Sequence, residues 1–249
     1  MACAGQIDPA AGAVVYAPNL GWRDVPLAGR LAQAFRVPVI VENDVRAAAW
    51  GEFVAGAGGR EDSLVAVFVG TGVGSGAVLD GRLWRGAGNA AGEVGHTQVV
   101  PDGLPCRCGR LGCLEQYVSG SGFQRRLAAA MTAGRTSRLV AVCAGDPARL
   151  TARDVHAAAV EGDALARELW RDATRFLTMA VANYVTLVNP RVLVLGGGVI
   201  ETVPALFDAV AEGVPRLTTI LSARSLRIER ARLGDLSGVI GAAALATPS

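Results

Sequence analysis

The sequence predicts an α/β fold, and three observations support this. Apolar runs rich in β-branched residues alternate along the chain with patterns of helical period. Hydrophobic residues make up 51% of the 249 residues and charged residues only 18%, which excludes a disordered polypeptide. Two apolar runs are followed by glycine-rich turns, at residues 70–76 and 196–198, the place where α/β folds bind ligands. The chain is long enough for one large domain or two ordinary ones.

Strands are expected where short apolar runs are bounded by turn residues. They lie at residues 37–41, 63–69, 76–79, 82–84, 191–195 and 225–230. The second, third and fourth of them are close enough in sequence to form antiparallel hairpins, with a tight turn at Asp80 and Gly81. The segment 56–60, Gly-Ala-Gly-Gly-Arg, reads as a hinge or boundary loop.

Helices are expected where apolar residues recur at helical spacing. They lie at about residues 44–54, 119–131, 151–160, 164–188, 203–212 and 236–246. The longest begins after an N-cap at Asp163 and ends at Asn189 and Pro190, because proline restricts the residue before it and cannot continue a helix. Residues 86–112 show no period, and so long an irregular segment indicates a function or a metal that holds it.

Charge and hydropathy exclude several classes of protein. The 24 basic residues are all arginine, so no lysine can form a Schiff base or hold a phosphate. A net charge of +2 without a basic run argues against binding to nucleic acid. No run of 18 apolar residues predicts a membrane span, and the first residues lack the pattern of a secretory signal. We expect an intracellular, cytoplasmic protein that does not interact with membranes.

One histidine and three of the five cysteines share a single loop. The spacing His96-x9-Cys106-x-Cys108-x4-Cys113 supplies one imidazole and three thiolates, a full tetrahedral set for a structural Zn²⁺. Zinc would order a loop that has no secondary structure of its own. The alternative is a group of reduced cysteines near a chance histidine. Three further residues stand alone and predict no site: Cys3, Cys143 and His156.

Two glycine-rich turns could bind phosphate. In the first, glycines at positions 70, 72 and 74 allow positive φ angles and close approach of the backbone to an anion, while Thr71 and Ser75 add hydroxyl donors. The second consists of Gly196, Gly197 and Gly198 at the end of an apolar run. Neither matches a Walker A or a Rossmann motif. A plain turn and a helix-entry loop remain the alternatives.

Four polar residues could form a site for a substrate rich in hydroxyl groups. Asp44 opens a helix after an apolar run, where it could act as a simple N-cap, a role that Asn43 fills equally well. Glu93, His96 and Glu115 lie near glycine turns and would be costly in a core unless paired. Such a cluster can bind several sugar hydroxyls, and one carboxylate can accept the proton of an attacking hydroxyl.

These motifs, in this order, resemble the ROK family (repressors, open reading frames and kinases), which contains bacterial glucokinases. The matching segments span nearly the whole chain and are residues 18–27, 42–52, 69–103, 106–120, 189–199 and 233–246. The resemblance implies an actin-like, RNase H-like sugar kinase fold with two lobes. The expected N-terminal lobe is residues 1–60, with 236–246 as a returning helix. The expected C-terminal lobe is residues 61–235, with the zinc loop at 93–115.

The resemblance also implies an ATP-dependent hexose kinase of the glucokinase type. Asp44 would be the catalytic base, and Asn43, Glu93, His96 and Glu115 would join it in binding sugar hydroxyls, with His96 also a zinc ligand. The phosphate and nucleotide residues would be Gly70, Thr71, Gly72, Gly74, Gly196, Gly197 and Gly198. The cofactors would be structural Zn²⁺ and Mg²⁺ with ATP. The partners would be a sugar, ATP and further copies of the chain in a dimer or tetramer.

One family feature is missing. Family kinases open with a β-hairpin whose D-x-G-G-T motif holds phosphate and the Mg²⁺–ATP complex, and this sequence contains no such motif. We therefore expect the N-terminal lobe to lack its leading strands and phosphoryl transfer by this chain to be impaired. Two alternatives stay open: a sugar-sensing transcriptional regulator of the family without its helix-turn-helix, and a zinc-stabilised sugar-binding remnant without catalysis.

Overall fold

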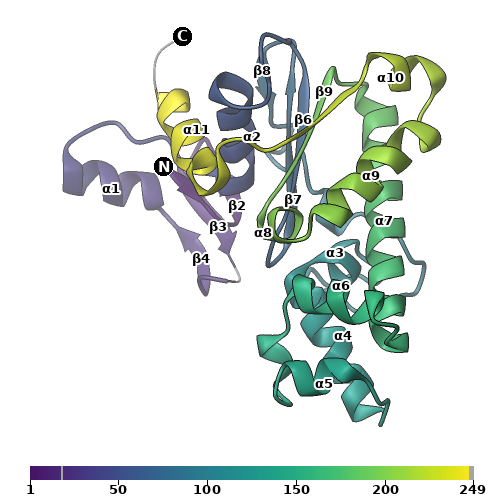
Figure 1. Ribbon diagram of the computed structural model, residues 1–249. Coiled ribbons are helices and arrows are strands. Elements are labelled where there is room, and N and C mark those ends of the chain that lie inside the picture. Colours follow the sequence, from purple (N-terminus) through teal and green to yellow (C-terminus); the bar gives the residue numbers. More distant parts are fainter. Residues whose placement is uncertain (18, 247–249) are drawn as a thin grey trace.

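The computed structural model describes residues 1–17 and 19–246, and its largest unit is a five-stranded sheet (Figure 1). The strands are β6 (Leu64–Val69), β7 (Val73–Leu79), β8 (Arg82–Trp84), β9 (Val192–Gly196) and β10 (Arg227–Arg230), in the order β10-β9-β6-β7-β8. β6 and β10 run parallel to β9, whereas β7 is antiparallel to both β6 and β8. The predicted hairpins and their turn are confirmed: Asp80 and Gly81 both have positive φ, at 50° and 69°.

The two faces of this sheet are covered by different helices. Alternate residues of the central strands, such as Val65, Val67 and Leu193, belong to a large core with the helical part of the chain. The residues between them, such as Leu64 and Val194, pack on the opposite side against Ala49 and its neighbours. Every residue of β9 is buried, as a central strand covered on both faces requires.

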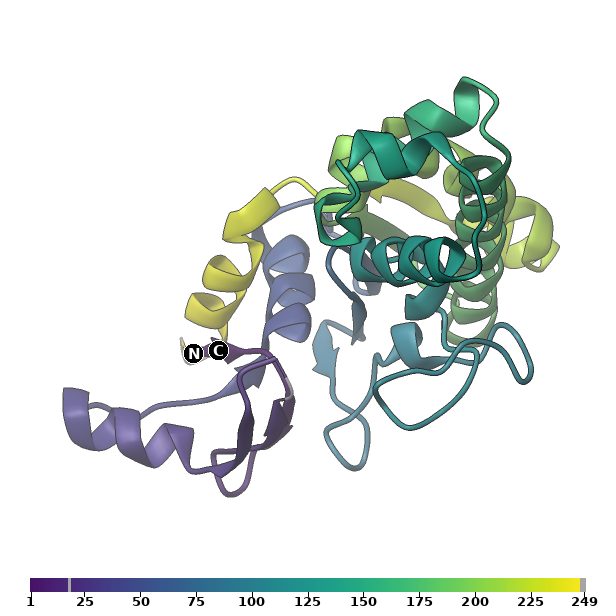
Figure 2. The same ribbon diagram turned by 90° about the horizontal axis from the view of Figure 1, so that it is seen from below.

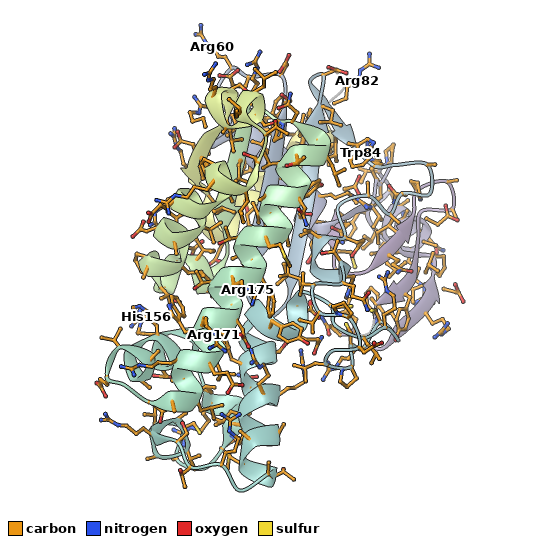
Figure 3. The ribbon with its side chains drawn as sticks, turned by 90° about the vertical axis from the view of Figure 1, so that its right-hand side faces the viewer. Arg60, Arg82, Trp84, His156, Arg171 and Arg175 are labelled. Atoms are coloured by element: carbon orange, nitrogen blue, oxygen red, sulfur yellow. The ribbon has the colours of Figure 1, made fainter. Side chains whose placement is uncertain are left out.

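The helices of the large core lie between residues 115 and 217. They are α3 (Glu115–Val118), α4 (Gly120–Thr132), α5 (Arg138–Val142), α6 (Ala152–Val160), α7 (Ala164–Val188), α8 (Gly198–Thr202) and α9 (Pro204–Leu217). A further helix, α10 (Ile220–Ser225), precedes β10 and exposes Ile220 and Leu221. The predicted ends of α7 are confirmed: the Asp163 side chain accepts from the Ala166 amide, and Asn189 ends the helix at φ 51°. Arg171 and Arg175 mark this helix in Figure 3.

On the other face, α2 (Asp44–Ala55) and α11 (Ser237–Ala246) pack together in the molecule's middle. Figure 2 shows both helices between the N-terminal strands and the five-stranded sheet. Small residues make their contact: a side chain at Gly51 or Gly241 would meet the backbone of the opposite helix, at Ser237 and Ala47. The predicted C-terminal helix is thus confirmed.

The N-terminal strands form a separate three-stranded antiparallel sheet. It consists of β2 (Gln6–Asp8), β3 (Ala13–Ala17) and β4 (Trp22–Val25), followed by α1 (Leu27–Phe35). A short parallel pair, β1 (Ala2–Cys3) and β5 (Glu42–Asn43), connects it to α2. A small core joins these pieces, with Ile7, Val14 and Leu27 buried in it.

The strand predicted at residues 37–41 is wrong. These residues form no ladder, and only residues 42–43 pair, with β1. Val37 and Ile40 are 53% and 55% exposed. β-Branched residues favour an extended backbone, but a strand also needs a neighbouring strand with which to pair. Among the described residues, the neighbouring strand β1 pairs only with Glu42 and Asn43.

The long segment predicted to be irregular is confirmed as such. Residues 86–112 contain turns, two isolated bridges and a single turn of 3₁₀ helix, η1 (Val94–His96). Two other 3₁₀ turns are η2 (Pro147–Arg149) and η3 (Gly234–Leu236). Across the described residues, no helix has both the length and the apolar character needed to cross a lipid bilayer.

Candidate functional site

The first residues of β7 contact the neighbours of the candidate catalytic and substrate residues. The backbone amide of Val73 donates to Oε2 of Glu115 over 3.1 Å. Gly74 lies against Val45, the residue after Asp44, so closely that an added Cβ would stand 2.8 Å from Cγ2 of Val45. A side chain at position 74 would therefore push β7 away from the start of α2.

The same strand also holds the segment that carries Glu93 and His96. The hydroxyl of Ser75 donates to the carbonyl of Gly92 over 2.6 Å. Gly95 lies directly on the backbone of Val73, where no side chain would fit. Three consecutive residues of β7 thus touch the chain beside Asp44, Glu93 and His96, and touch Glu115 itself. The fold thus brings three segments that are far apart in sequence, around Asp44, around Glu93 and His96, and at Glu115, to the start of β7.

Asn43 and Asp44 have different roles at the start of α2. Oδ1 of Asn43 accepts from the amides of Val45 and Arg46, both at 3.0 Å, so Asn43 is the N-cap. Its Nδ2 donates to the carbonyl of Gly5 over 3.2 Å. Asp44 is the first helical residue; its Oδ1 accepts from Val45, and its Oδ2 has no hydrogen-bond partner among the described residues. The capping role that could have explained Asp44 is filled by its neighbour.

The four predicted metal ligands are close together. One ligand atom from each of His96, Cys106, Cys108 and Cys113 lies within 4.8 Å of all the others. Sγ of Cys108 and Sγ of Cys113 are 3.6 Å apart, and Sγ of Cys106 is 3.7 Å from Nδ1 of His96. Zn–S bonds of about 2.3 Å at tetrahedral angles place ligand atoms about 3.8 Å apart, so the donor set fits a four-coordinate zinc.

The loop backbone preforms this cluster. The amide of Gly109 donates to the carbonyl of Cys106, and the amide of Cys106 donates to the carbonyl of Arg110, which makes a tight turn around Cys108. Burial raises the pKa of Cys113, and its hydrogen bonds with Cys108 and Cys106 add to this, so that it reaches about 12. A bound cation would have to displace that proton, as zinc does.

The two glycine turns lie side by side at the carboxyl ends of the central strands β6 and β9. β6 and β9 are parallel and in register, with Phe68 opposite Gly196. Gly197, at φ 88°, lies against the backbone of Val69, where a Cβ would be 2.6 Å from the carbonyl oxygen. The turn after β6 also receives a hydrogen bond at the carbonyl of Gly70 from Gly120, at the start of α4. The turns and a helix start therefore form one rim.

The reason for the glycines in the first turn differs from the predicted one. No positive φ occurs at positions 70, 72, 74 or 76. Close approach does occur, but to the protein itself: an added Cβ at Gly72 would stand 2.6 Å from Oε2 of Glu115. The expected approach to a bound anion stays a prediction. The expectation that Ser75 offers a hydroxyl to a ligand is wrong, because Ser75 is buried and its hydroxyl binds Gly92. Thr71 is exposed.

Two buried carboxylates escaped the sequence analysis. Glu52 is fully buried and accepts hydrogen bonds from the amides of Ala57, Arg232 and Leu233, and so joins two distant connections. Glu42 is 4% exposed and forms an ion pair with Arg46. An acidic residue within an alanine-rich helix, and a Glu–Arg pair four residues apart, are the signals that could have indicated them.

The three residues predicted to form no site lie outside the metal cluster found in the described residues. Cys3 and Cys143 are buried free thiols, and Cys3 lies in β1 opposite Asn43. His156 is half-buried, with its ring 4.5 Å from that of Trp170. His156 lies on α6 and is labelled in Figure 3.

Comparison with known proteins places these features in context. A model of the ROK family matches residues 1–248. The glucokinase of Halalkalibacterium halodurans is 37% identical over 238 residues, which are 95% of this chain and 72% of that protein. The structure of a ROK family glucokinase from Streptomyces griseus in complex with glucose and AMPPNP matches with a TM-score of 0.80 and 34% identity, over 98% of this chain and 79% of that one.

A regulator of the same family has an equally similar fold. The structure of a ROK family transcriptional regulator, a homologue of the E. coli MLC protein, also gives a TM-score of 0.80, at 30% identity, over 96% of this chain and 59% of that one. These matches confirm the α/β fold of the actin-like sugar kinases that the sequence predicted.

Proposed function

The chain belongs to the ROK family, and we propose that it is an ATP-dependent hexose kinase of the glucokinase type. The observation that supports this most strongly is the convergence around the start of β7. There the chain beside Asp44, Glu93 and His96 and the carboxylate of Glu115 are held by three consecutive residues. Carboxylates and an imidazole arranged in this way can bind several sugar hydroxyls at once.

In this proposal Asp44 is the catalytic base. Its Oδ2 has no hydrogen-bond partner in residues 1–17 and 19–246, and its place in the first turn of α2 keeps the carboxylate beside positive backbone dipoles. It would accept the proton of the sugar hydroxyl as that oxygen attacks the γ-phosphorus of ATP. The sugar would be oriented by Asn43, Glu93, His96 and Glu115. The side chain of Asn43 would bind the sugar in addition to capping α2 and binding Gly5.

The rim of glycine turns would bind the nucleotide. The phosphates would lie against the first turn, with Gly70, Thr71, Gly72 and Gly74. The rest of the nucleotide would lie against the second turn, with Gly196, Gly197 and Gly198. Gly74 lies inside β7 and would contribute by keeping the first turn close to α2. Mg²⁺ would arrive with ATP and offset the charge of the phosphates.

Zinc, in this proposal, has a structural role. His96, Cys106, Cys108 and Cys113 would fill all four positions of the ion, which leaves none for a substrate or a water molecule. The ion would fix the loop that begins at Glu93 and ends at Glu115. Its effect on the sugar would therefore be indirect, through the position of these side chains.

Residues 1–60 with α11 would form one lobe and residues 61–235 the other, with the sugar between them. Assembly into dimers or tetramers and a cytoplasmic location complete the proposal. A sugar-sensing regulator is the second candidate, favoured by the equal TM-score of the regulator structure. An upstream helix-turn-helix in the gene would support the regulator, and an upstream strand with D-x-G-G-T would support the kinase.

Calorimetric titration of the chain with glucose, with other hexoses in parallel, tests the sugar site. Glu115→Gln should weaken binding about tenfold or more, because it removes a charged hydrogen-bond acceptor. Glu161→Gln, at an exposed glutamate on the far helices, is the matched control and should bind as the parent does. A parent that binds no hexose, or equal affinities for parent and Glu115→Gln, would contradict the proposed site.

A further inference from the structure

A buried ion pair lies at the junction between α2 and the irregular segment after β8. Arg46 is 2% exposed and Glu42 4% exposed. Nε and Nη2 of Arg46 both lie 2.9 Å from Oε1 of Glu42. Burial raises the pKa of Glu42, but Arg46 and further hydrogen bonds from Asn43 and Arg85 outweigh it, so that the pKa is lowered. Such a pair persists in a protein interior only when its remaining atoms also find partners.

Apart from the amide of Asn43, which donates to Oε1 of Glu42 over 2.9 Å, those partners belong to one segment, residues 85–91. Oε2 of Glu42 accepts from Nε of Arg85 at 2.7 Å, at the beginning of the segment. Nη1 of Arg46 donates to the carbonyl of Asn89 at 2.8 Å and approaches that of Ala91 at 3.5 Å, near its end. The amide of Ala91 donates back to the carbonyl of Arg85 at 3.0 Å. The segment is a closed loop held at both ends by one ion pair.

The loop is also tied to the N-terminal sheet. Nδ2 of Asn89 donates to the carbonyl of Ile7, in β2, over 2.7 Å. Asn89 has φ 54°, a left-handed conformation that asparagine tolerates better than most residues. The network therefore connects β2, the start of α2 and the loop in one buried set of polar contacts.

The residues of this network are close in sequence to the candidate sugar-binding residues. Glu42 stands directly before Asn43 and Asp44, and the loop ends two residues before Glu93 and five before His96. The same two side chains thus anchor both segments that carry the sugar-site residues. We propose that Arg46 is a positioning residue of the sugar site: with Glu42 it sets Glu93 and His96 against Asp44. This inference rests on the proposed function for its effect on sugar binding.

A purely structural role makes a different prediction. Arg46→Met leaves the buried carboxylate of Glu42 with Arg85 as its remaining charged partner, so it would lower stability whatever else the pair does. Replacing both partners by apolar residues of similar size, in Glu42→Leu/Arg46→Met, removes the buried charge and can restore stability without restoring the contacts to Asn89 and Ala91. Arg46→Lys keeps the charge but loses the planar fork that serves Glu42 and the carbonyls together.

The test compares these variants with the parent by hydrogen exchange, calorimetric titration with glucose and thermal unfolding. The informative amides are those of Ala91, His96 and Thr97, with the amides of β6 as an internal reference. Arg216→Met is the matched control, because Arg216 forms an exposed pair with Glu212 at the same spacing of four residues.

In the folded double variant we expect exchange at the three amides to rise about tenfold or more while β6 is unchanged. Glucose affinity should fall about tenfold or more, with Arg46→Lys between the double variant and the parent. Unchanged exchange would overturn the proposal, and so would faster exchange with unchanged affinity. A parent that binds no hexose would contradict the proposed function instead, and the exchange data would still decide whether Arg46 orders residues 85–96.

Discussion

Asn43 and Asp44 are adjacent, but their side chains make different numbers of hydrogen bonds with the rest of the protein. Asn43 caps α2 with one oxygen and binds Gly5 with its nitrogen, so its position is set by the protein. Asp44 uses one oxygen locally and leaves the other without a protein partner among the described residues. A carboxylate in this position is suited to a proton transfer, because its backbone holds it in place and it forms no ion pair within the part of the chain that the structure describes.

Asp44→Asn tests the role of that oxygen. The variant should keep glucose affinity within a few-fold of the parent, because the amide preserves shape, and should lose about 100-fold or more in turnover, because it cannot accept a proton. Affinity is measured in the 249-residue chain and turnover in a form extended by a D-x-G-G-T hairpin. Asp80→Asn, in the hairpin turn at the other end of β7, is the control. Normal turnover in Asp44→Asn would remove it from the base role.

At the scale of elements, the metal loop and the α2–α11 contact are the two features on which the site depends most. The metal loop folds back on itself through backbone hydrogen bonds, such as those from Val99 to Gly112 and from Leu114 to Thr97, and these bring the metal ligands together. The two helices are held by glycines that allow their backbones to touch. Each feature yields a separate prediction.

Cys108→Ser should lower the zinc content from about one ion per chain and weaken glucose binding, because the loop between Glu93 and Glu115 loses its anchor. Plasma emission spectroscopy measures the first effect and calorimetry the second. Cys143→Ser, at a buried cysteine outside the cluster, should retain the metal. A Cys108→Ser chain that lacks zinc but binds glucose normally would show that the metal does not order the sugar site.

Gly241→Ala should destabilise the fold by about 1–3 kcal/mol, because its methyl group would meet the backbone of Ala47 in α2. Gly29→Ala provides the matched comparison in α1, where nothing lies within 4 Å of the added Cβ. There the substitution should stabilise by about 0.5–1 kcal/mol through helix propensity. Urea unfolding of both variants gives the two free energies; equal effects would argue against close helix packing.

At the scale of the whole molecule, sugar binding and phosphoryl transfer have different requirements. The candidate sugar residues and the zinc ligands are all present and gathered around β7 and its loop. The sequence contains no D-x-G-G-T motif, which in the resembling kinases holds the phosphates. Positioning and charge stabilisation account for nearly all of the catalysis of phosphoryl transfer, so the loss of one phosphate contact is costly.

We therefore expect the 249-residue chain to bind glucose but to phosphorylate it about 1,000-fold more slowly than a form extended by such a hairpin. Release of ADP in the presence of glucose and Mg²⁺–ATP measures the rate in both forms. Glucose-free reactions serve as the blank, and glucose binding in the same preparation shows that the site is intact. Rapid turnover by the 249-residue chain would make the missing motif dispensable.

The α/β class, the central strands, the long helix with its caps and the four metal ligands followed from local patterns, because periodicity, capping residues and ligand spacing are written in neighbouring residues. Tertiary structure alone decided that residues 37–41 pair with no strand, that the glycines after β6 serve close approach and not positive φ, and that Ser75 turns inward. It also placed Arg46 on the loop that leads to Glu93. These outcomes depend on which distant segments meet, and burial against a partner from elsewhere in the chain overrides local preference.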